Sequence, residues 1–235
     1  FVNAGWGLYN TWGYYTPSKE LWDAFEEGDQ RREATILYPG NHVRFMGRDI
    51  TFGGYCTDGS IPSYTTSHVS AGLINQKFIS PWETGSYSEV SNQRDKLWNT
   101  LNCCLMRYAD VMLMKAEALI WTKGEGDAEA KNLLDDIRER AGRATKAQLQ
   151  NERRCELAFE FQPSRHIDVV RWGLAEEYYS KPLHSVVSKM VDGRIETEEV
   201  EVYPGRTFNP TYNKVFPIPQ TAFNGTVNLT QNKGY

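Results

Sequence analysis

The strongest hydrophobic pattern lies between residues 105 and 142, where apolar residues recur at helical spacing in two neighbouring segments. The first segment contains Tyr108, Met112, Ala116 and Leu119, and the second contains Ala130, Leu133, Leu134, Ile137 and Ala141. A period of about 3.6 residues places such positions on one helical face. Asp127 can cap the second helix and Gly142 can end it. We therefore predict two antiparallel helices, at 105–121 and 127–142. Their contact should be formed by Met112, Ala116, Leu133 and Ile137.

Weaker patterns predict three further helices, each with its own start signal. The first begins at Thr16-Pro17 and ends at Gly28, because threonine suits the N-cap and proline suits the first helical position. The second follows a capping box of Thr145 and Gln148. The third follows Pro163-Ser164, which separates it from the second.

Two amphipathic helices joined by a short turn form an αα-hairpin, which cannot bury its apolar face alone. The predicted pair is close to the roughly 34 residues of a tetratricopeptide unit. We therefore predict a mainly α fold, with a tetratricopeptide-like helical-repeat scaffold, a loop-rich lobe and short strands. One domain should span residues 1–235. It should comprise the lobe with a short helix at 1–100, a helical core at 101–180 and an extended region at 181–235.

Glycine and proline punctuate the segments on both sides of this core, which favours loops and short strands. Two short strands are expected at 65–69 and 77–79. Nearer the C-terminus, β-branched residues on both sides of Asp192-Gly193 predict a hairpin that turns at this dipeptide. The prolines beyond residue 203 favour extended backbone.

The composition excludes several classes of protein. A net charge of −4 and a pI near 5.7 are unlike the basic footprint of a nucleic-acid-binding protein. No apolar run approaches the roughly 20 residues of a membrane helix. The chain starts without methionine or a signal-peptide pattern, so we expect a fragment or a processed piece. Without a CxxC pair we expect no zinc site and free thiols at Cys56, Cys103, Cys104 and Cys155.

Charged residues of both signs crowd the segment from 152 to 171. Glu152, Glu156 and Glu160 are spaced one helical turn apart, and a carboxylate pair could serve a glycosidase as acid and base. Neighbouring arginines favour ion pairs instead. We predict a structural ion network of Arg153, Glu156, Glu160, Arg165, Asp168 and Arg171. The glycosidase stays open as an alternative. Since HxxxH and GxSxG motifs are absent, no metal, cofactor or catalytic residue is predicted.

Aromatic residues gather in turn-rich sequence, where packing explains them less easily than ligand binding. The alternative is that some of these rings pack under the loop and hold it to the helices. Flat rings stack on the C–H faces of sugars, and several rings must act together because each gain is modest. Amide side chains can bind the hydroxyl groups. The candidate ligand-binding residues are Trp6, Tyr9, Asn10, Trp12 and Tyr14 in the N-terminal loop, with Trp82 and Tyr87 as a second group.

Several segments of the chain form a recognisable series. They are ELWDAFEEGDQR at 20–31, RYADVMLMKAEAL at 107–119, IRERAG at 137–142, ERRCELAFE at 152–160, RHIDVVRWG at 165–173, PIPQ at 217–220 and LTQNKGY at 229–235. Together these segments resemble motifs of the SusD/RagB family, follow one another in the family's order and span nearly the whole chain.

The resemblance implies a noncatalytic lipoprotein of the outer-membrane surface that captures polysaccharide or oligosaccharide for nutrient uptake. Its implied partners are a glycan and a SusC-like TonB-dependent transporter. It also implies tetratricopeptide-like helix pairs, a lipid anchor and an N-terminal helical half outside this sequence. Besides the glycosidase, two alternatives stay open: a purely structural partner of the transporter, and capture of peptides in place of glycans.

Overall fold

The computed structural model describes residues 16–45, 48–53, 72–77, 104–140, 149–160, 164–225 and 228–235. The chain divides into two compact units. The first unit comprises residues 1–162 and 184–202, and the second comprises 163–183 and 203–235. Among the described residues, no helix is both long and apolar enough to cross a membrane.

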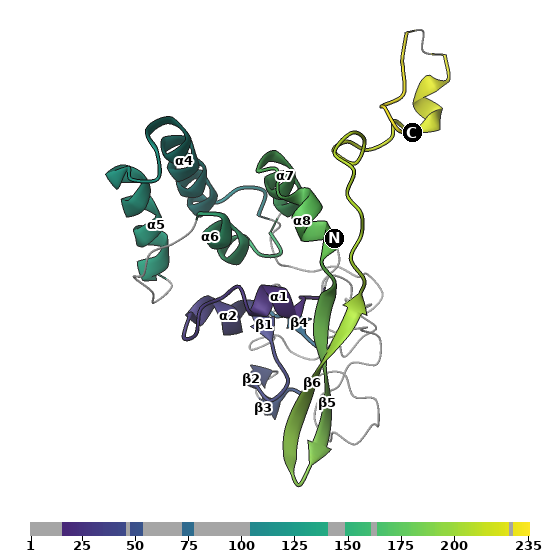
Figure 1. Ribbon diagram of the computed structural model, residues 1–235. Helices are drawn as coiled ribbons and strands as arrows, with labels where there is room; N and C mark the ends of the chain where they lie inside the picture. Colours follow the sequence, from purple (N-terminus) through teal and green to yellow (C-terminus); the bar gives the residue numbers. More distant parts are fainter. Residues whose placement is uncertain are drawn as a thin grey trace, which may run out of the picture. The chain divides into compact units, whose positions relative to one another are not determined.

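The predicted helix pair is confirmed in the first unit. Helix α4 spans Tyr108–Lys123 and helix α5 spans Ala128–Arg140, joined by a short turn (Figure 1). The Asp127 carboxylate caps α5 by accepting a hydrogen bond from the Ala130 amide at 2.9 Å, and Gly124 ends α4 with a φ of 93°. The four predicted contact residues all belong to one core cluster around Leu113, Leu134 and Leu157.

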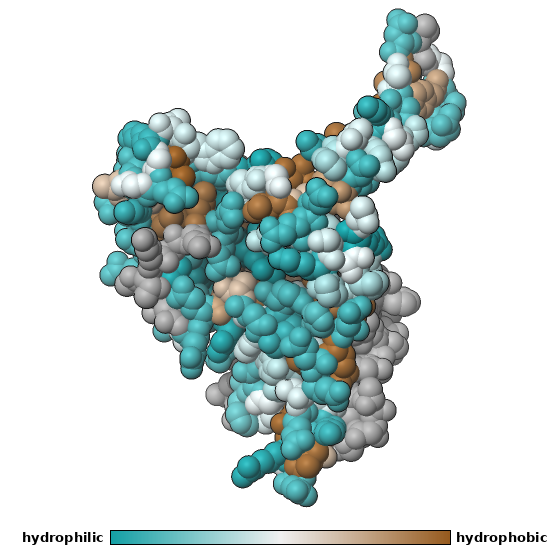
Figure 2. Space-filling model, viewed as in Figure 1, coloured by the Kyte–Doolittle hydropathy of each residue, from teal (hydrophilic) through white to brown (hydrophobic). Residues whose placement is uncertain are grey.

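One face of α4 stays uncovered although the opposite face is fully buried. Its large apolar side chains are spaced by three or seven residues, which keeps them on one side of the helix, and include Tyr108, Val111, Met114 and Trp121. Tyr108 is 78% exposed and Trp121 is 70% exposed. Hydrophobic residues are visible in this part of an otherwise largely hydrophilic face (Figure 2).

Two short helices open the described chain. Helix α1 spans Lys19–Trp22, and its N-cap is Ser18, whose hydroxyl accepts a hydrogen bond from the Leu21 amide. The helix predicted from Thr16 therefore starts later, and it is shorter than predicted. Helix α2 spans Gln30–Thr35 and was not predicted; its cap is Asp29, which binds the Arg31 amide at 3.0 Å.

Among the described residues, the strands form three sheets of two strands each. Strand β1 (Ile36–Leu37) pairs with β4 (Ile74–Asn75), and β2 (His42–Phe45) pairs with β3 (Arg48–Thr51). Lys77 lies in a turn, so the strand predicted at 77–79 is wrong at its first residue; the strand predicted at 65–69 lies outside the described residues.

The C-terminal hairpin agrees with its prediction. Strand β5 spans Leu183–Val191 and strand β6 spans Arg194–Tyr203. Asp192 and Gly193 both have positive φ angles, 48° and 75°, as a two-residue turn of the right twist requires. Gly72 lies directly against strand β5, because its amide donates a hydrogen bond to the Val186 carbonyl at 3.0 Å. A Cβ added at residue 72 would lie 2.1 Å from that oxygen.

Helix α6 spans Leu149–Glu156 and packs against α4 and α2 within the first unit. The second unit contains α7 (Ser164–Arg171), α8 (Ala175–Ser180) and the 3₁₀ helix η1 (Gln220–Phe223). Its small core consists of Val169, Ala175 and Phe208. The tight turn between α7 and α8 uses Gly173 at a φ of 73°.

Candidate functional site

Three carboxylates project from α6 and the turn after it into the interior of the first unit. Glu152, Glu156 and Glu160 are 1%, 4% and 7% exposed. Glu152 and Glu156, four residues apart on α6, share one face of the helix, as the sequence pattern indicates, whereas Glu160 follows in the turn after α6. Buried carboxylates need ion pairs and hydrogen bonds, because desolvation of an unpaired charge is strongly unfavourable.

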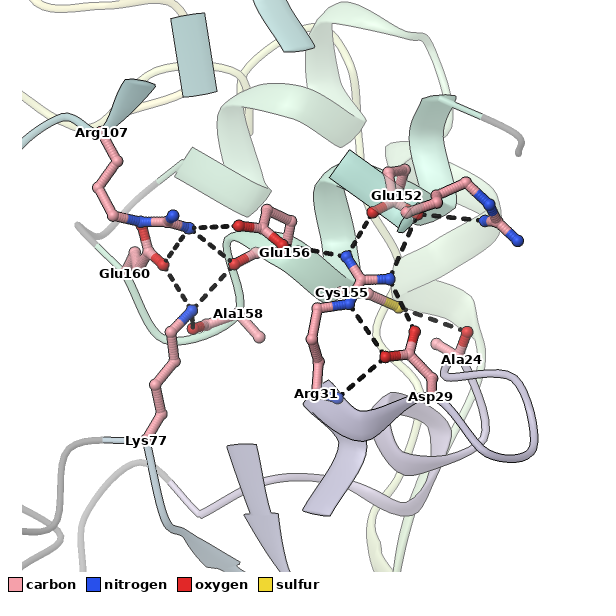
Figure 3. Close-up of polar contacts among 11 residues, drawn as sticks. Ala24, Asp29, Arg31, Lys77, Arg107, Glu152, Cys155, Glu156, Ala158 and Glu160 are labelled. Carbon is pink, nitrogen blue, oxygen red and sulfur yellow. Dashed lines mark hydrogen bonds and ion pairs between the residues drawn. The ribbon is translucent and has the colours of Figure 1, made fainter. Parts of the chain in front are cut away.

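Arg31 on α2 neutralises one end of this row (Figure 3). Its Nη1 donates to Glu152 and, at 3.0 Å, to Glu156 Oε2, while its Nη2 donates to Asp29 Oδ2 at 2.7 Å. Burial raises the pKa of Asp29, but hydrogen bonds from Arg31 outweigh burial and hold it below the usual value. The same carboxylates raise the pKa of Arg31 against the opposing effect of its burial. The guanidinium therefore stays charged inside the protein.

Arg138 on α5 completes this end of the cluster. Its Nη1 donates to Glu152 Oε2 at 3.2 Å, and its Nη2 donates to Glu26 Oε1 at 2.9 Å. Glu152 thus accepts hydrogen bonds from guanidinium groups on two different helices. The ion pairs therefore connect α2, α5 and α6.

Arg107 and Lys77 neutralise the other end (Figure 3). Arg107 immediately precedes α4; its Nε donates to Glu160 Oε2 at 2.7 Å and its Nη2 to Glu156 Oε1 at 3.0 Å. The Lys77 ammonium pairs with Glu160 and donates to the carbonyls of Glu156 and Ala158, at 2.9 and 3.2 Å. Burial lowers the pKa of Lys77, partly offset by Glu160.

The end of α6 has an unusual backbone. Phe159 has a φ of 62°, a left-handed conformation that a bulky side chain rarely adopts. The turn presents the last carbonyls of α6 to the two cations: Lys77 and Arg107 both donate to the Glu156 carbonyl. Cations also interact favourably with the negative end of a helix dipole. The cluster therefore caps a helix in addition to pairing charges.

Cys155, the only described thiol in this region, is unreactive. The Cys155 sulfur donates a hydrogen bond to the Ala24 carbonyl at 3.4 Å. Burial raises its pKa to about 12, so the reactive thiolate is disfavoured. Cys155 and the exposed Cys104 are free, as expected, while Cys56 and Cys103 lie outside the described residues.

The arrangement of these ion pairs suits a structural role. A glycosidase carboxylate must touch the sugar, and these three side chains are enclosed by protein and occupied by arginine and lysine. Across the described parts of the chain, no group of three or more histidine, cysteine, aspartate or glutamate side chains could hold a metal ion.

The structure places the six residues of the predicted ion network as follows. In the first unit, Glu156 and Glu160 share Arg107, and Arg153 donates to Asp110 at 3.0 Å. In the second unit, Asp168 and Arg171 pair at 2.9 Å, and the Arg165 guanidinium lies 4.8 Å from the centre of the Tyr178 ring. Sequence reasoning missed the main cations of the cluster, Arg31, Lys77, Arg107 and Arg138. Three of them stand within the segments quoted above for the family resemblance, but spacing alone did not connect them to α6.

The seven candidate ligand-binding residues, from Trp6 to Tyr14 and at Trp82 and Tyr87, lie outside the described residues. Their role stays a prediction.

Comparison with known proteins identifies the family. The model of the SusD family matches residues 8–235. Among curated proteins there is no match.

Two solved structures are similar in fold. One is surface glycan-binding protein A from Bacteroides uniformis, with a TM-score of 0.59 and 22% identity over 95% of this chain. The other is a SusD superfamily protein from Parabacteroides distasonis, with a TM-score of 0.50 and 24% identity over 94% of this chain. This chain spans 42% of the length of each. With a family match over nearly its entire length, the chain belongs to the SusD family.

Proposed function

We propose that this protein binds a polysaccharide or oligosaccharide at the outer-membrane surface without cleaving it. It then delivers the glycan to a SusC-like TonB-dependent transporter for nutrient uptake, and an N-terminal lipid anchor holds it to the membrane. The observation that carries this proposal is the family match over residues 8–235. Similarity in fold to a surface glycan-binding protein supports the same function.

The absence of catalysis is supported by the charges of α6. The carboxylates that a glycosidase would need, Glu152, Glu156 and Glu160, are all buried, and each has a cationic partner. A sugar would have to displace arginine or lysine to reach them. This makes the glycosidase the weaker alternative.

A tetratricopeptide-like scaffold is supported by the αα-hairpin of α4 and α5. In stacked helical repeats each hairpin buries one face within itself and offers another to the next helix. The exposed apolar side chains Tyr108, Val111, Met114 and Trp121 form such an outer face. Helical repeats provide rigid surfaces from which binding loops can project.

We place the glycan contact on the aromatic residues Trp6, Tyr9, Asn10, Trp12, Tyr14, Trp82 and Tyr87. A carrier must release its cargo, so affinity should lie in the micromolar-to-millimolar range, about −4 to −8 kcal/mol. Two or three stacked rings, each worth roughly 1 kcal/mol, would supply much of this free energy.

The test is isothermal titration calorimetry of the 235-residue chain with a panel of oligosaccharides. Trp6→Ala, Trp12→Ala and Trp82→Ala are compared with Trp121→Ala, a control that removes an exposed ring from α4. We expect at least one of the three loop variants to bind about tenfold more weakly, with the control unchanged. Unchanged affinity in all three would rule out the aromatic loops. Flat titrations across the panel, together with binding to the transporter, would support the purely structural alternative.

A further inference from the structure

The second unit carries a charge opposite to that of the whole chain. Residues 163–183 and 203–235 contain six lysines and arginines but three aspartates and glutamates, which gives +3 in a chain of −4. No acidic residue follows Glu201. The positive residues there are Arg206, Lys214 and Lys233, and none of them has an ion-pair partner among the described residues. The segment therefore offers uncompensated positive charge.

Two parts of this segment pack together into what we call the C-terminal platform, residues 212–218 with 231–235. The Asn232 side chain donates to the Phe216 carbonyl at 2.7 Å, and the Tyr235 hydroxyl donates to the Val215 carbonyl at 3.1 Å. Gln231 binds both the amide and the carbonyl of Ile218. Side-chain bonds thus fix an otherwise irregular backbone.

Gly234 brings the two parts into direct contact. It has a φ of 100°, and a Cβ at this position would lie 2.2 Å from the Cβ of Tyr212. Lys233 directly precedes this contact, and Lys214 lies two residues beyond Tyr212. Both lysines are exposed and belong to the platform that this contact closes.

The platform also exposes apolar surface. Phe216 is 75% exposed, Tyr235 is 50% exposed and Val215 is 49% exposed. The Phe216 ring lies 6.3 Å from the His166 ring of α7. A hydrogen bond of 2.6 Å between His166 and the Tyr179 hydroxyl fixes the histidine ring beside Phe216. An exposed ring held in this way can stack on a ligand with little loss of conformational freedom.

We infer that the C-terminal platform is a second glycan contact, in addition to the aromatic loops, and that it binds an acidic glycan. Phe216 and Tyr235 contact the sugar faces, and Lys214 and Lys233 contact a carboxylate or sulfate group. Aromatic rings stack on the C–H faces of sugars, and uncompensated ammonium groups pair with carboxylate or sulfate groups, so together they suit an anionic glycan. No aspartate or glutamate occurs at residues 202–235, so such a ligand would meet no repulsion from acidic side chains of this segment. This inference rests on the proposed function and names its ligand class.

The experiment compares an oligomer of uronic acid with a neutral oligosaccharide of equal length and with a sulfated one, by calorimetry at 20 and 300 mM salt. We expect the carboxylated or sulfated ligand to bind more tightly at low salt, and the preference to shrink at high salt because exposed charges are screened. Which of the two anionic ligands is preferred identifies the charged group.

The decisive variant is Lys214→Ala with Lys233→Ala. Exposed ion pairs are individually weak, so we expect about a tenfold loss of affinity for the acidic ligand and little change for the neutral one. Lys131→Ala with Lys189→Ala is the matched control, since it removes the same charge from exposed positions of the first unit. Phe216→Ala should weaken binding of both ligands.

The outcomes separate this inference from the proposed function. If neutral glycans bind as well as acidic ones, or if the lysine pair and its control behave alike, the platform inference is wrong while glycan capture stands. If no glycan of any charge binds, both fail. Circular dichroism melting curves establish that each variant remains folded.

Discussion

Arg31 and Glu152 are 121 positions apart in the sequence, yet they form an ion pair inside the first unit. Glu152 is 1% exposed, and Arg31 also reaches Asp29 and Glu156. One guanidinium group therefore joins the short N-terminal helix α2 to the helix that carries the row of carboxylates.

Replacing Arg31 with methionine should lower the free energy of unfolding by about 3–5 kcal/mol, because three carboxylates lose a common partner. Chemical denaturation measures the loss. Lys115→Met is the control: Lys115 pairs with Glu129 on the surface, where an ion pair is worth about 0–1 kcal/mol. Equal losses in the two variants would contradict a framework role for Arg31.

Glu160→Ala should destabilise the protein by a similar amount, roughly 3–5 kcal/mol, because Lys77 and Arg107 are left without a shared carboxylate. Glycan affinity should not change below the melting temperature. Thermal melting and calorimetry on the same samples provide the two measurements. Lost binding at an unchanged melting temperature would instead make Glu160 part of a ligand site.

Gly72→Ala should destabilise the first unit by about 1–3 kcal/mol, because the added methyl group collides with the Val186 carbonyl. Gly126→Ala is the matched control, since no atom lies within 4 Å of its added Cβ. There we expect little change or a gain of about 0.4–1 kcal/mol, from the lower entropy of the unfolded chain. Melting curves that rank the two variants in the opposite order would refute the close approach of residue 72 to β5.

His184 should make stability depend on pH. Its Nδ1 lies 2.7 Å from Glu20 Oε1, and this hydrogen bond, with smaller contributions from Glu20, Glu199 and Glu201, raises the pKa of His184. Because the pKa of His184 is higher in the folded protein than in the unfolded chain, protonated His184 stabilises the fold. This stabilisation is fully present below the unfolded-state pKa of about 6.5 and is lost as the pH rises through the folded-state pKa.

The melting temperature of the wild type should therefore exceed that of His184→Asn by more at pH 6 than at pH 9. The pH titration of the His184 imidazole signal by NMR reports its pKa directly. A value at or below about 6.5 would contradict the prediction.

The elements predicted best from the sequence are those with local signals. Helices α4 and α5 follow from a 3.6-residue period, and the turn of the last hairpin follows from Asp192-Gly193. The short helices α2 and α8 have too few residues for a period to emerge, and tertiary contacts decide them. Even the start of α1 shifted, because Ser18 caps it in place of Thr16.

The charged residues of α6 show a different limit. Their spacing indicated a common face, but their partners Arg31, Lys77 and Arg107 come from other elements, 49 to 125 positions away. No local pattern encodes such pairs. Likewise, the packing of Gly234 on Tyr212 depends on a backbone path that composition and periodicity do not reveal.

The separation between partners in the ion cluster also bears on the order of folding. The α4–α5 hairpin closes through a connection of a few residues, whereas Arg31 must find Glu152 and Glu156 across 121 and 125 positions. Closing so long a loop costs more chain entropy and is slow. The cluster should therefore form after the folding transition state, so that its variants mainly accelerate unfolding and leave the folding rate nearly unchanged. The buried ion pairs would then stabilise a helical core that has already assembled, and would slow its unfolding.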